Sequence, residues 1–106
     1  MDMQSDVLKG HVDVLVLSTL ARERAHGYAL VEALRERSDG AFDLAEGTLY
    51  PALYRLEGQG LVSSSWEKGS TRRRRVYELT ARGAAELRRE RDAWERYVRA
   101  MDAVMA

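Results

Sequence analysis

Residues Glu46–Val62 read EGTLYPALYRLEGQGLV, and the architecture expected for the whole chain follows from this stretch. On a helix that advances 100° per residue, Leu49, Leu53 and Leu56 fall within one narrow sector, which would pack on a core. The opposite side has no carboxylate and consists of Gly47, Thr48, Pro51, Tyr54, Arg55 and Gly58. A helix that only needs to be soluble usually shows Glu and Lys there. This face therefore indicates close approach to a polyanion.

The ends of this helix can also be predicted. We expect it to stop at Gly60, before the extended run Leu61-Val62. Pro51 lies past the first turn of a helix that begins near Glu46, where the missing N–H removes a regular hydrogen bond. The sequence therefore predicts a bent or irregular start to this helix.

Two further helices are expected ahead of this stretch. Ser5 is a suitable N-cap for a helix of about 18 residues with apolar residues on most faces, which implies burial on more than one side. His26-Gly27-Tyr28 forms a break, and a second helix then runs to a left-handed stop at Gly40. The segment with Phe42 and Leu44 is too short for more than a loop or a single bridge.

A β-hairpin is expected after the central helix, with arms at 61–66 and 72–79 joined by a turn at 67–71. In the second arm Tyr77 and Leu79 share the face that would meet the helices. Arg72 to Arg75 form a run of four arginines. Because like charges repel one another and no acids alternate with them, contact with phosphates is favoured over a merely solvated loop.

Thr80 is expected to cap a long final helix whose apolar positions repeat every seven residues. A single helix at the end of a small domain cannot bury such a stripe on itself, so it needs the first helix or a second subunit. We expect a homodimer interface formed by Leu8, Val12, Leu87, Trp94, Tyr97, Met101 and Val104.

The composition excludes several classes of protein. With 106 residues, 45% of them hydrophobic and 32% charged, the chain suits one small ordered domain. The absence of cysteine excludes disulfides and thiol chemistry and fits a reducing compartment. The longest apolar run, Val14–Leu17, is far shorter than the roughly 20 residues that span a bilayer, and no secretory signal opens the chain. No membrane association is expected.

Catalysis and metal binding are not expected either. The chain lacks a glycine-rich phosphate loop, an H-E-x-x-H motif and a Ser-His-Asp set with supporting context. Its two histidines have neither cysteine partners nor metal-binding spacing, so no metal or cofactor is predicted. The formal net charge is +0, so any binding of nucleic acid must depend on local clusters of charge.

The expected order is thus three helices, a hairpin and a long helix, which is a mainly α fold with a small β-hairpin. We expect a winged helix-turn-helix domain over residues 1–79, whose N-terminal helix also supports a dimer. A C-terminal dimerisation helix would follow over residues 80–106. In the winged motif the second helix of the turn lies in the major groove and the hairpin contacts the flanking backbone.

Six motifs cover nearly the whole chain: Leu8-Lys9-Gly10, His26-Gly27-Tyr28, Glu46–Leu53, Arg55-Leu56-Glu57, Gly60-Leu61-Val62 and Arg74–Thr80. In this order and spacing they resemble the PadR family of transcriptional regulators, in its short form with a single C-terminal helix. Val76 departs from the pattern, since the family usually has a second Tyr there. The resemblance implies a cytoplasmic dimer that represses genes by binding a near-palindromic operator in double-stranded DNA. A small molecule, often aromatic or drug-like, would relieve repression.

The resemblance also implies which residues contact DNA. Thr48 and Tyr50 match the recognition-helix motif, Arg55 matches a commonly basic position, and Arg74 and Arg75 match basic residues of the wing. Tyr50 also lies at the edge of the leucine stripe, where it could instead be a boundary residue of the core. The whole expected set is Thr48, Tyr50, Tyr54, Arg55, Lys68, Arg72, Arg74 and Arg75.

Trp94 matches a frequent tryptophan of the family's last helix, which in multidrug-binding relatives stacks on planar ligands at the dimer centre. Packing in the dimer core is the favoured alternative for Trp94, and a core or interface role is favoured for His11. The expected effector contacts are His11, Leu15, Trp94, Tyr97 and Val98. The alternative function is a winged-helix module that dimerises and binds protein rather than DNA, which the zero net charge supports.

Overall fold

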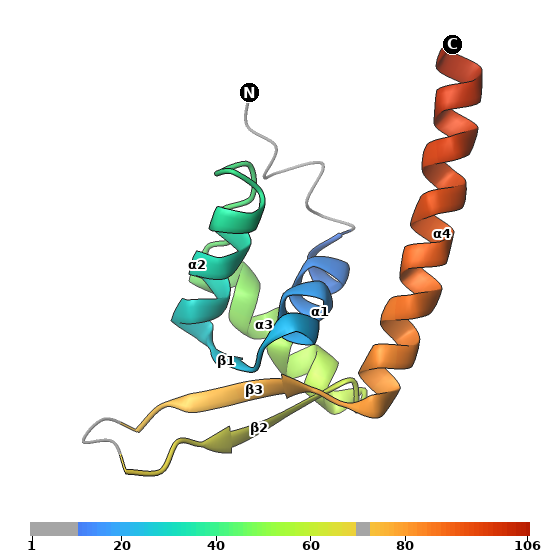
Figure 1. Cartoon of the computed structure of the whole chain (residues 1–106). Helices are drawn as coiled ribbons and strands as arrows, with labels where there is room; N and C mark the ends of the chain where they lie inside the picture. The colour runs from blue at the N-terminus through green and yellow to red at the C-terminus, as the bar shows by residue number, and fades with distance from the viewer. Residues whose placement is uncertain (1–10, 70–72) are drawn as a thin grey trace.

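The computed structural model describes residues 11–69 and 73–106. Its elements follow the expected order, with one short strand added (Figure 1). They are α1 (Val12–Arg22), β1 (Ala25–His26), α2 (Gly27–Arg37), α3 (Glu46–Gly58), β2 (Val62–Trp66), β3 (Arg75–Leu79) and α4 (Ala81–Met105). The predicted mainly α fold with a hairpin is therefore confirmed. His11 precedes the first turn of α1 as its N-cap, whereas the predicted cap at Ser5 lies outside the described residues.

The hairpin belongs to a three-stranded antiparallel sheet with the order β1-β3-β2. Strands β2 and β3 pair from Val62 opposite Leu79 to Trp66 opposite Arg75. Strand β1 adds only two pairs, Ala25 with Tyr77 and His26 with Val76. The sequence predicted only a break at His26, because a two-residue strand has no periodicity. This strand places the start of α2 beside the wing.

The core lies between the three N-terminal helices and one face of the sheet. The α3 residues Leu49, Leu53 and Leu56 are fully buried, as their spacing predicted. They pack with residues of α1 and α2 in one cluster, and Tyr77 of β3 closes that cluster from the sheet side. The outer side of α3 is thereby directed away from the rest of the molecule.

The predicted helix ends are also confirmed. Gly40 and Gly60 have φ angles of 82° and 77°, the left-handed conformation that glycine adopts without strain. Thr80 is the N-cap of α4, and its Oγ1 accepts a hydrogen bond from the N–H of Gly83 at 2.9 Å. The same hydroxyl donates to the carbonyl oxygen of Gly60 at 2.7 Å, which ties the start of α4 to the end of α3.

The structure shows no break at the predicted irregular start of α3, and a bend there stays a prediction. The helix is continuous from Glu46 through Pro51 to Gly58, and the N–H of Leu49 donates to the carbonyl of Ala45 at 3.0 Å in the regular way. Pro51 leaves the carbonyl of Gly47 without its helical donor. Because Gly47 is exposed, water can hydrate that carbonyl, so the helix tolerates the proline.

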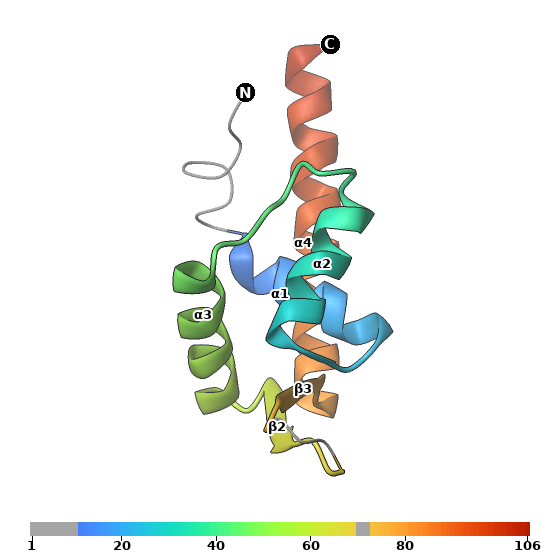
Figure 2. The ribbon, with the colours of Figure 1, turned by 90° about the vertical axis from the view of Figure 1, so that its left-hand side faces the viewer.

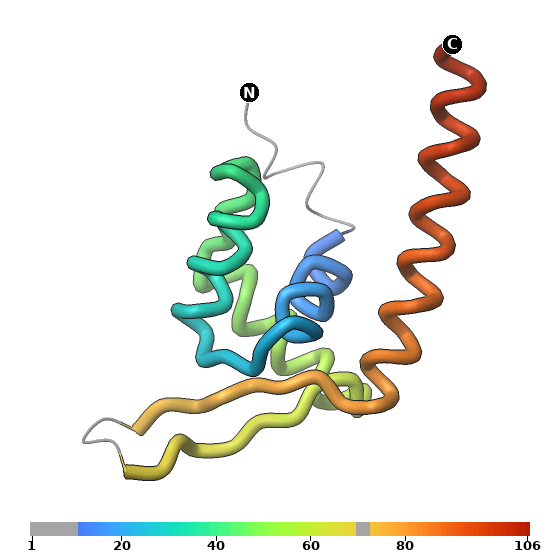
Figure 3. The backbone as a smooth tube through the Cα atoms, viewed as in Figure 1, coloured from blue at the N-terminus to red at the C-terminus, as the bar shows by residue number. Residues whose placement is uncertain are grey.

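Helix α4 is packed against the body along its first part, as far as the contact of Trp94 with His11, and then extends beyond it (Figures 1 and 3). Leu87, in its second turn, is 5% exposed and belongs to the core of its own chain. The heptad predicts Leu87 at a dimer interface, but in the structure α1 and the sheet already cover it. Among the described residues, no helix is both long and apolar enough to cross a membrane.

Candidate nucleic-acid interface

The outer face of α3 is open along the edge of the molecule, with no other element outside it (Figure 2). Thr48, Pro51 and Gly58 are exposed, and Tyr54 is exposed over 83% of its surface. Glu57 is half-buried beside this face, and its Oε2 accepts a hydrogen bond from the Ser64 hydroxyl of β2 at 2.7 Å. The exposed centre of α3 therefore presents small and hydroxyl-bearing groups without a carboxylate.

The wing presents arginines that are held in place by Trp66. The guanidinium carbons of Arg73 and Arg75 lie 4.6 Å and 5.2 Å from the centre of the Trp66 ring, which is the geometry of a cation–π contact. Arg75 Nε also donates to Ser64 Oγ at 2.8 Å. Trp66 is directly opposite Arg75 in the sheet, so ring and cations share the face that also carries Tyr77. The wing thus has ordered positive charge beside α3.

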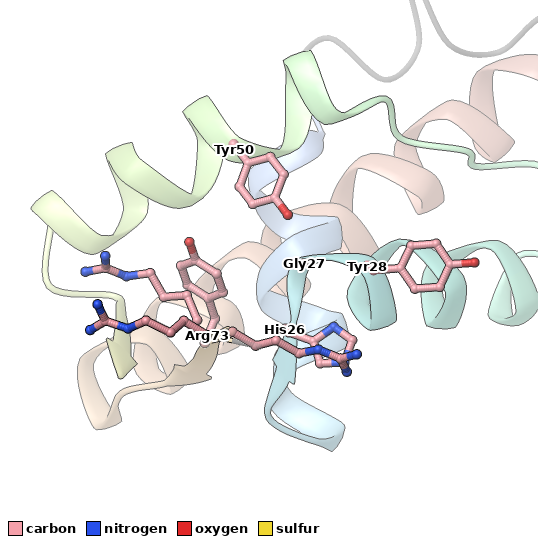
Figure 4. A pocket seen from close by; sticks show the side chains of 8 residues that line it. His26, Gly27, Tyr28, Tyr50 and Arg73 are labelled. Atoms are coloured by element: carbon pink, nitrogen blue, oxygen red, sulfur yellow. The ribbon is translucent and has the colours of Figure 1, made fainter. Parts of the chain in front are cut away.

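A hollow of about 560 Å³ lies between the start of α2 and the wing (Figure 4). Figure 4 shows the Tyr50 hydroxyl pointing toward Gly27, with His26 and Tyr28 on the adjoining wall. The lining residues are His26, Gly27, Tyr28, Tyr50, Arg73, Arg74, Arg75 and Tyr77. None of them is acidic. This hollow is suited to an anion.

A second hollow of about 560 Å³ adjoins the first, on the other side of Tyr50. It is bounded by α3 and the sheet, and its lining residues are Tyr50, Tyr54, Glu57, Gly58, Arg75 and Tyr77, of which Glu57 is acidic. Burial raises the pKa of the Tyr77 phenol between the two hollows, and the nearby Arg75 opposes part of that effect. Tyr77 is therefore a neutral hydrogen-bonding group at neutral pH.

Arg55 lies on the side of α3 that faces α1, rather than toward the wing. Its guanidinium forms an ion pair with the Asp13 carboxylate of α1, and both side chains are about half exposed. Sequence reasoning did not anticipate this partner. Contact between Arg55 and DNA stays a prediction, and the ion pair would have to open or be shared for it to occur.

The structure brings the expected DNA-contacting residues to two places. Tyr50, Arg74 and Arg75 line the first hollow, and Tyr54 lines the second, while Thr48 and Arg55 lie along the α1 side of α3. Lys68 is exposed at the turn of the wing, and Arg72 lies outside the described residues. The residues that the sequence did not assign to the site are His26, Tyr28 and Trp66, whereas Arg73 was included only as part of the run Arg72 to Arg75. The one available signal was the His26-Gly27-Tyr28 break.

The residues expected to contact an effector are partly gathered at the junction of α1 and α4. The ring of Trp94 lies 5.4 Å from that of His11 in an edge-to-face arrangement and 5.7 Å from that of Tyr97 in a stacked one. Leu15 is packed on the core, and Val98 is half-buried on α4. Trp94, Tyr97 and Met101 remain about half exposed, and Val104 near the end of the helix is almost fully exposed. Leu8 lies outside the described residues.

No group of three His, Cys, Asp or Glu side chains that could hold a metal ion occurs within residues 11–69 and 73–106. The site is built instead from arginines, phenols, a histidine and backbone. Three helices, a basic antiparallel wing and an outward-facing third helix define a winged helix-turn-helix protein.

The chain belongs to the transcriptional regulator PadR-like family, whose model matches residues 16–89. Members of this family are transcriptional regulators and not enzymes. A transcriptional regulator of Mycobacterium tuberculosis is 38% identical over 84 residues, which cover 79% of this chain and 76% of that protein. Transcriptional regulator YqjI of Escherichia coli is 30% identical over 86 residues, which cover 81% of this chain but 40% of that longer protein.

Solved structures agree with this assignment. A transcriptional regulator from Clostridium thermocellum superposes with a TM-score of 0.85 at 32% identity, covering 92% of this chain and 96% of the other. A PadR family transcriptional regulator from Eggerthella lenta gives a TM-score of 0.82 at 35% identity, covering 97% of this chain and 88% of the other. The protein is thus a transcriptional regulator of the PadR family.

Proposed function

We propose that this regulator is a homodimeric repressor that binds a near-palindromic operator through α3 and the wing and is released by a small effector. One observation carries the DNA-binding part of the proposal. The carboxylate-free face of α3 adjoins a hollow that three arginines line and no acidic residue enters. This arrangement concentrates positive charge on one side of a chain whose formal net charge is +0.

Each protomer would place α3 in a major groove, where Thr48 and Tyr54 can reach base edges. Gly47, Pro51 and Gly58 have small side chains that permit close approach of the helix backbone. The wing arginines would lie over the neighbouring phosphates, which supply affinity but not sequence preference. A cytoplasmic location agrees with this role.

The exposed stripe of α4 supports the homodimer. Trp94, Tyr97, Met101, Val104 and Met105 are 42% to 84% exposed along one helix that extends beyond the body. An apolar stripe of this length on a protruding helix is typical of a protein–protein interface. Pairing of α4 and the start of α1 between two copies would cover it. The two α3 helices must then lie about 34 Å apart to enter successive major grooves.

The effector part of the proposal rests on the aromatic group at the base of this stripe. The rings of His11, Trp94 and Tyr97 form an aromatic cluster. About half of the surface of Trp94 and Tyr97 is exposed and could contact a planar molecule. A ligand between the two copies of Trp94 would change the spacing of the α3 helices only if it bound the DNA-incompetent arrangement more tightly. Release of repression would follow from that difference in affinity.

The test uses duplex DNA from the region upstream of the protein's own coding sequence. Fluorescence anisotropy measures its binding at several salt concentrations. We expect Arg74→Ala to weaken binding to specific and random duplexes alike and to reduce the salt slope by about one, because it removes a single phosphate contact. Arg89→Ala is the matched control, because Arg89 lies on α4 in an ion pair with Glu86. Equal effects of the two substitutions would contradict the proposal. If the wild-type protein bound no duplex, a protein-binding module would become the better assignment.

A further inference from the structure

His26 makes two contacts that a single neutral imidazole cannot satisfy together. Its Nδ1 accepts a hydrogen bond from the N–H of Ala29 at 3.3 Å and so caps α2. Its Nε2 lies 3.4 Å from Nη1 of Arg74, across the hollow between α2 and the wing. Both partners, the amide and the guanidinium, can only donate.

The cap fixes the tautomer of the imidazole. Because the Ala29 amide must donate, Nδ1 has to be the acceptor, and the ring proton of a neutral His26 is then on Nε2. The Nε2–H group and the Arg74 guanidinium are therefore two donors directed at the same space. Two donors at 3.4 Å do not stabilise each other unless an acceptor joins them.

The surroundings indicate the charge of that acceptor. The hollow is lined by Arg73, Arg74 and Arg75 and by Tyr28, Tyr50 and Tyr77, and it has no acidic lining residue. Arg73 and Arg75 are held over Trp66, which leaves Arg74 as the guanidinium nearest to the imidazole. The start of α2 adds partial positive charge on the same side. An anionic oxygen placed between the two donors would satisfy both.

We propose that His26 Nε2–H and the Arg74 guanidinium together bind one phosphate group, so that His26 has a ligand-binding role in addition to capping α2. The source of the phosphate rests on the proposed DNA binding, in which it is a phosphodiester of the duplex backbone beside the wing. The cap holds the imidazole in the donor tautomer before the ligand arrives. His26 is thus a preorganised phosphate contact that links the position of α2 to that of the wing.

The two roles of His26 can be separated by substitution. Asn is a good N-cap, so His26→Asn keeps an acceptor for the Ala29 amide, but its shorter side chain has no N–H at the position of His26 Nε2. We expect this variant to melt close to the wild-type temperature and to bind a random-sequence duplex roughly tenfold more weakly at fixed salt. His26→Ala should lose both thermal stability and affinity. In His26→Asn/Arg74→Ala the two losses should not add, because both groups hold one phosphate.

Nitrogen-15 NMR of the two histidines gives an independent measurement, with His11 as the internal reference. The free protein should show His26 in the Nε2–H form, and added duplex should move its Nε2 signal in proportion to the bound fraction. A free protein in the Nδ1–H form would overturn the inference. The inference would also be overturned if duplex DNA bound while the His26 signal did not shift and His26→Asn bound like wild type. That result would leave the proposed DNA binding intact.

Inorganic phosphate is the second probe in the same experiment. If no duplex binds, the proposed function fails, and phosphate alone decides the site. A saturable shift of the His26 signal that Arg74→Ala abolishes would then support a site for free phosphate. The absence of any shift would overturn the inference together with the DNA-binding role.

Discussion

The hydroxyl group of Tyr50 on α3 fills the space beside Gly27 at the start of α2. A Cβ atom at position 27 would lie 2.3 Å from that oxygen and 2.8 Å from Cζ of the ring, distances at which some atom must move. The absence of a side chain at Gly27 therefore allows α2 and α3 to meet through the tyrosine. The same contact sets the wall of the hollow that faces the wing.

This contact predicts that Gly27→Ala will lower the free energy of unfolding by up to about 1 kcal/mol, because the half-exposed Tyr50 side chain that meets the new methyl group can move aside. Urea denaturation measures the change. Removing the ring should relieve the clash, so Gly27→Ala should cost much less in a Tyr50→Ala background. Gly47→Ala is the control, since nothing lies within 4 Å of its new methyl group, and a small gain in helix stability is expected. Equal effects of Gly27→Ala with and without the Tyr50 ring would contradict the contact.

Gly83 in the first turn of α4 should tolerate substitution even less. A Cβ there would lie 2.0 Å from the carbonyl oxygen of Leu61, and a backbone atom cannot rotate away as a side chain can. We expect Gly83→Ala to lower the free energy of unfolding by more than about 2 kcal/mol. Gly58→Ala, again with open space around the methyl group, is the matched comparison. If the two variants had the same melting temperature, the backbone at Leu61, between α3 and β2, would be able to move and accommodate the new methyl group, which would contradict the prediction.

Features that depend on neighbours close in sequence could be predicted, whereas contacts between residues far apart in the chain could not. Leucine spacing in α3, the stops at Gly40 and Gly60 and the cap at Thr80 depend on neighbours within a turn or two, so the sequence predicted them. Strand β1 was missed because its two residues acquire strand character only by pairing with Val76 and Tyr77, about fifty positions later.

The candidate site was predicted less completely for the same reason. Sequence patterns assigned Arg55 and Arg74 to DNA contact from their helix face and their charge. The partners of these arginines, Asp13 and His26, are 42 and 48 residues away and could be found only in three dimensions. Leu87 was assigned to a dimer interface because a heptad does not show which of its positions the chain itself covers.

The Arg55–Asp13 ion pair predicts that the first helix modulates DNA affinity. Asp13→Asn removes the competing carboxylate and a negative charge near α3, so the variant should bind duplex DNA up to about fivefold more tightly, as expected for a half-exposed pair. Glu32→Gln is the control, because it breaks a similar exposed pair with Arg35 on α2. Anisotropy titrations measure both. If Asp13→Asn and Glu32→Gln bind DNA with the same affinity, the Asp13 carboxylate does not compete with DNA for Arg55.

Tyr77 predicts a loss of stability at alkaline pH. Burial raises the pKa of its phenol, so the folded protein keeps the proton at a pH where the unfolded chain releases it. The stabilisation is complete below the unfolded value of about 10 and disappears as the pH rises from there through the folded pKa. The free energy of unfolding of the wild type should thus fall toward or below that of Tyr77→Phe above about pH 10. Tyr54→Phe, at an exposed ring, should change nothing in the profile; parallel curves for wild type and Tyr77→Phe would contradict the prediction.

The stripe on α4 predicts the oligomeric state. Met101 is 42% exposed on the helix face that also carries Trp94 and Tyr97, whereas Ala103 is exposed on the opposite face. If two copies pair through the stripe, wild type should sediment with twice the mass of the 12.0 kDa chain. Met101→Glu places a charge in that interface and should yield monomers, while Ala103→Glu should remain dimeric.

The same pair of variants tests whether dimerisation sets DNA affinity. If each protomer of the proposed dimer binds one half-site, loss of the dimer turns one bivalent contact into two independent weak ones. Met101→Glu should then bind the operator at least about 100-fold more weakly. Binding per half-site should change little, because residue 101 is in the last turns of α4, and the C-terminal end of that helix lies far from α3 and the wing (Figure 1). Ala103→Glu should bind as wild type. A monomeric Met101→Glu with full operator affinity would show that α4 pairing does not position the two recognition helices.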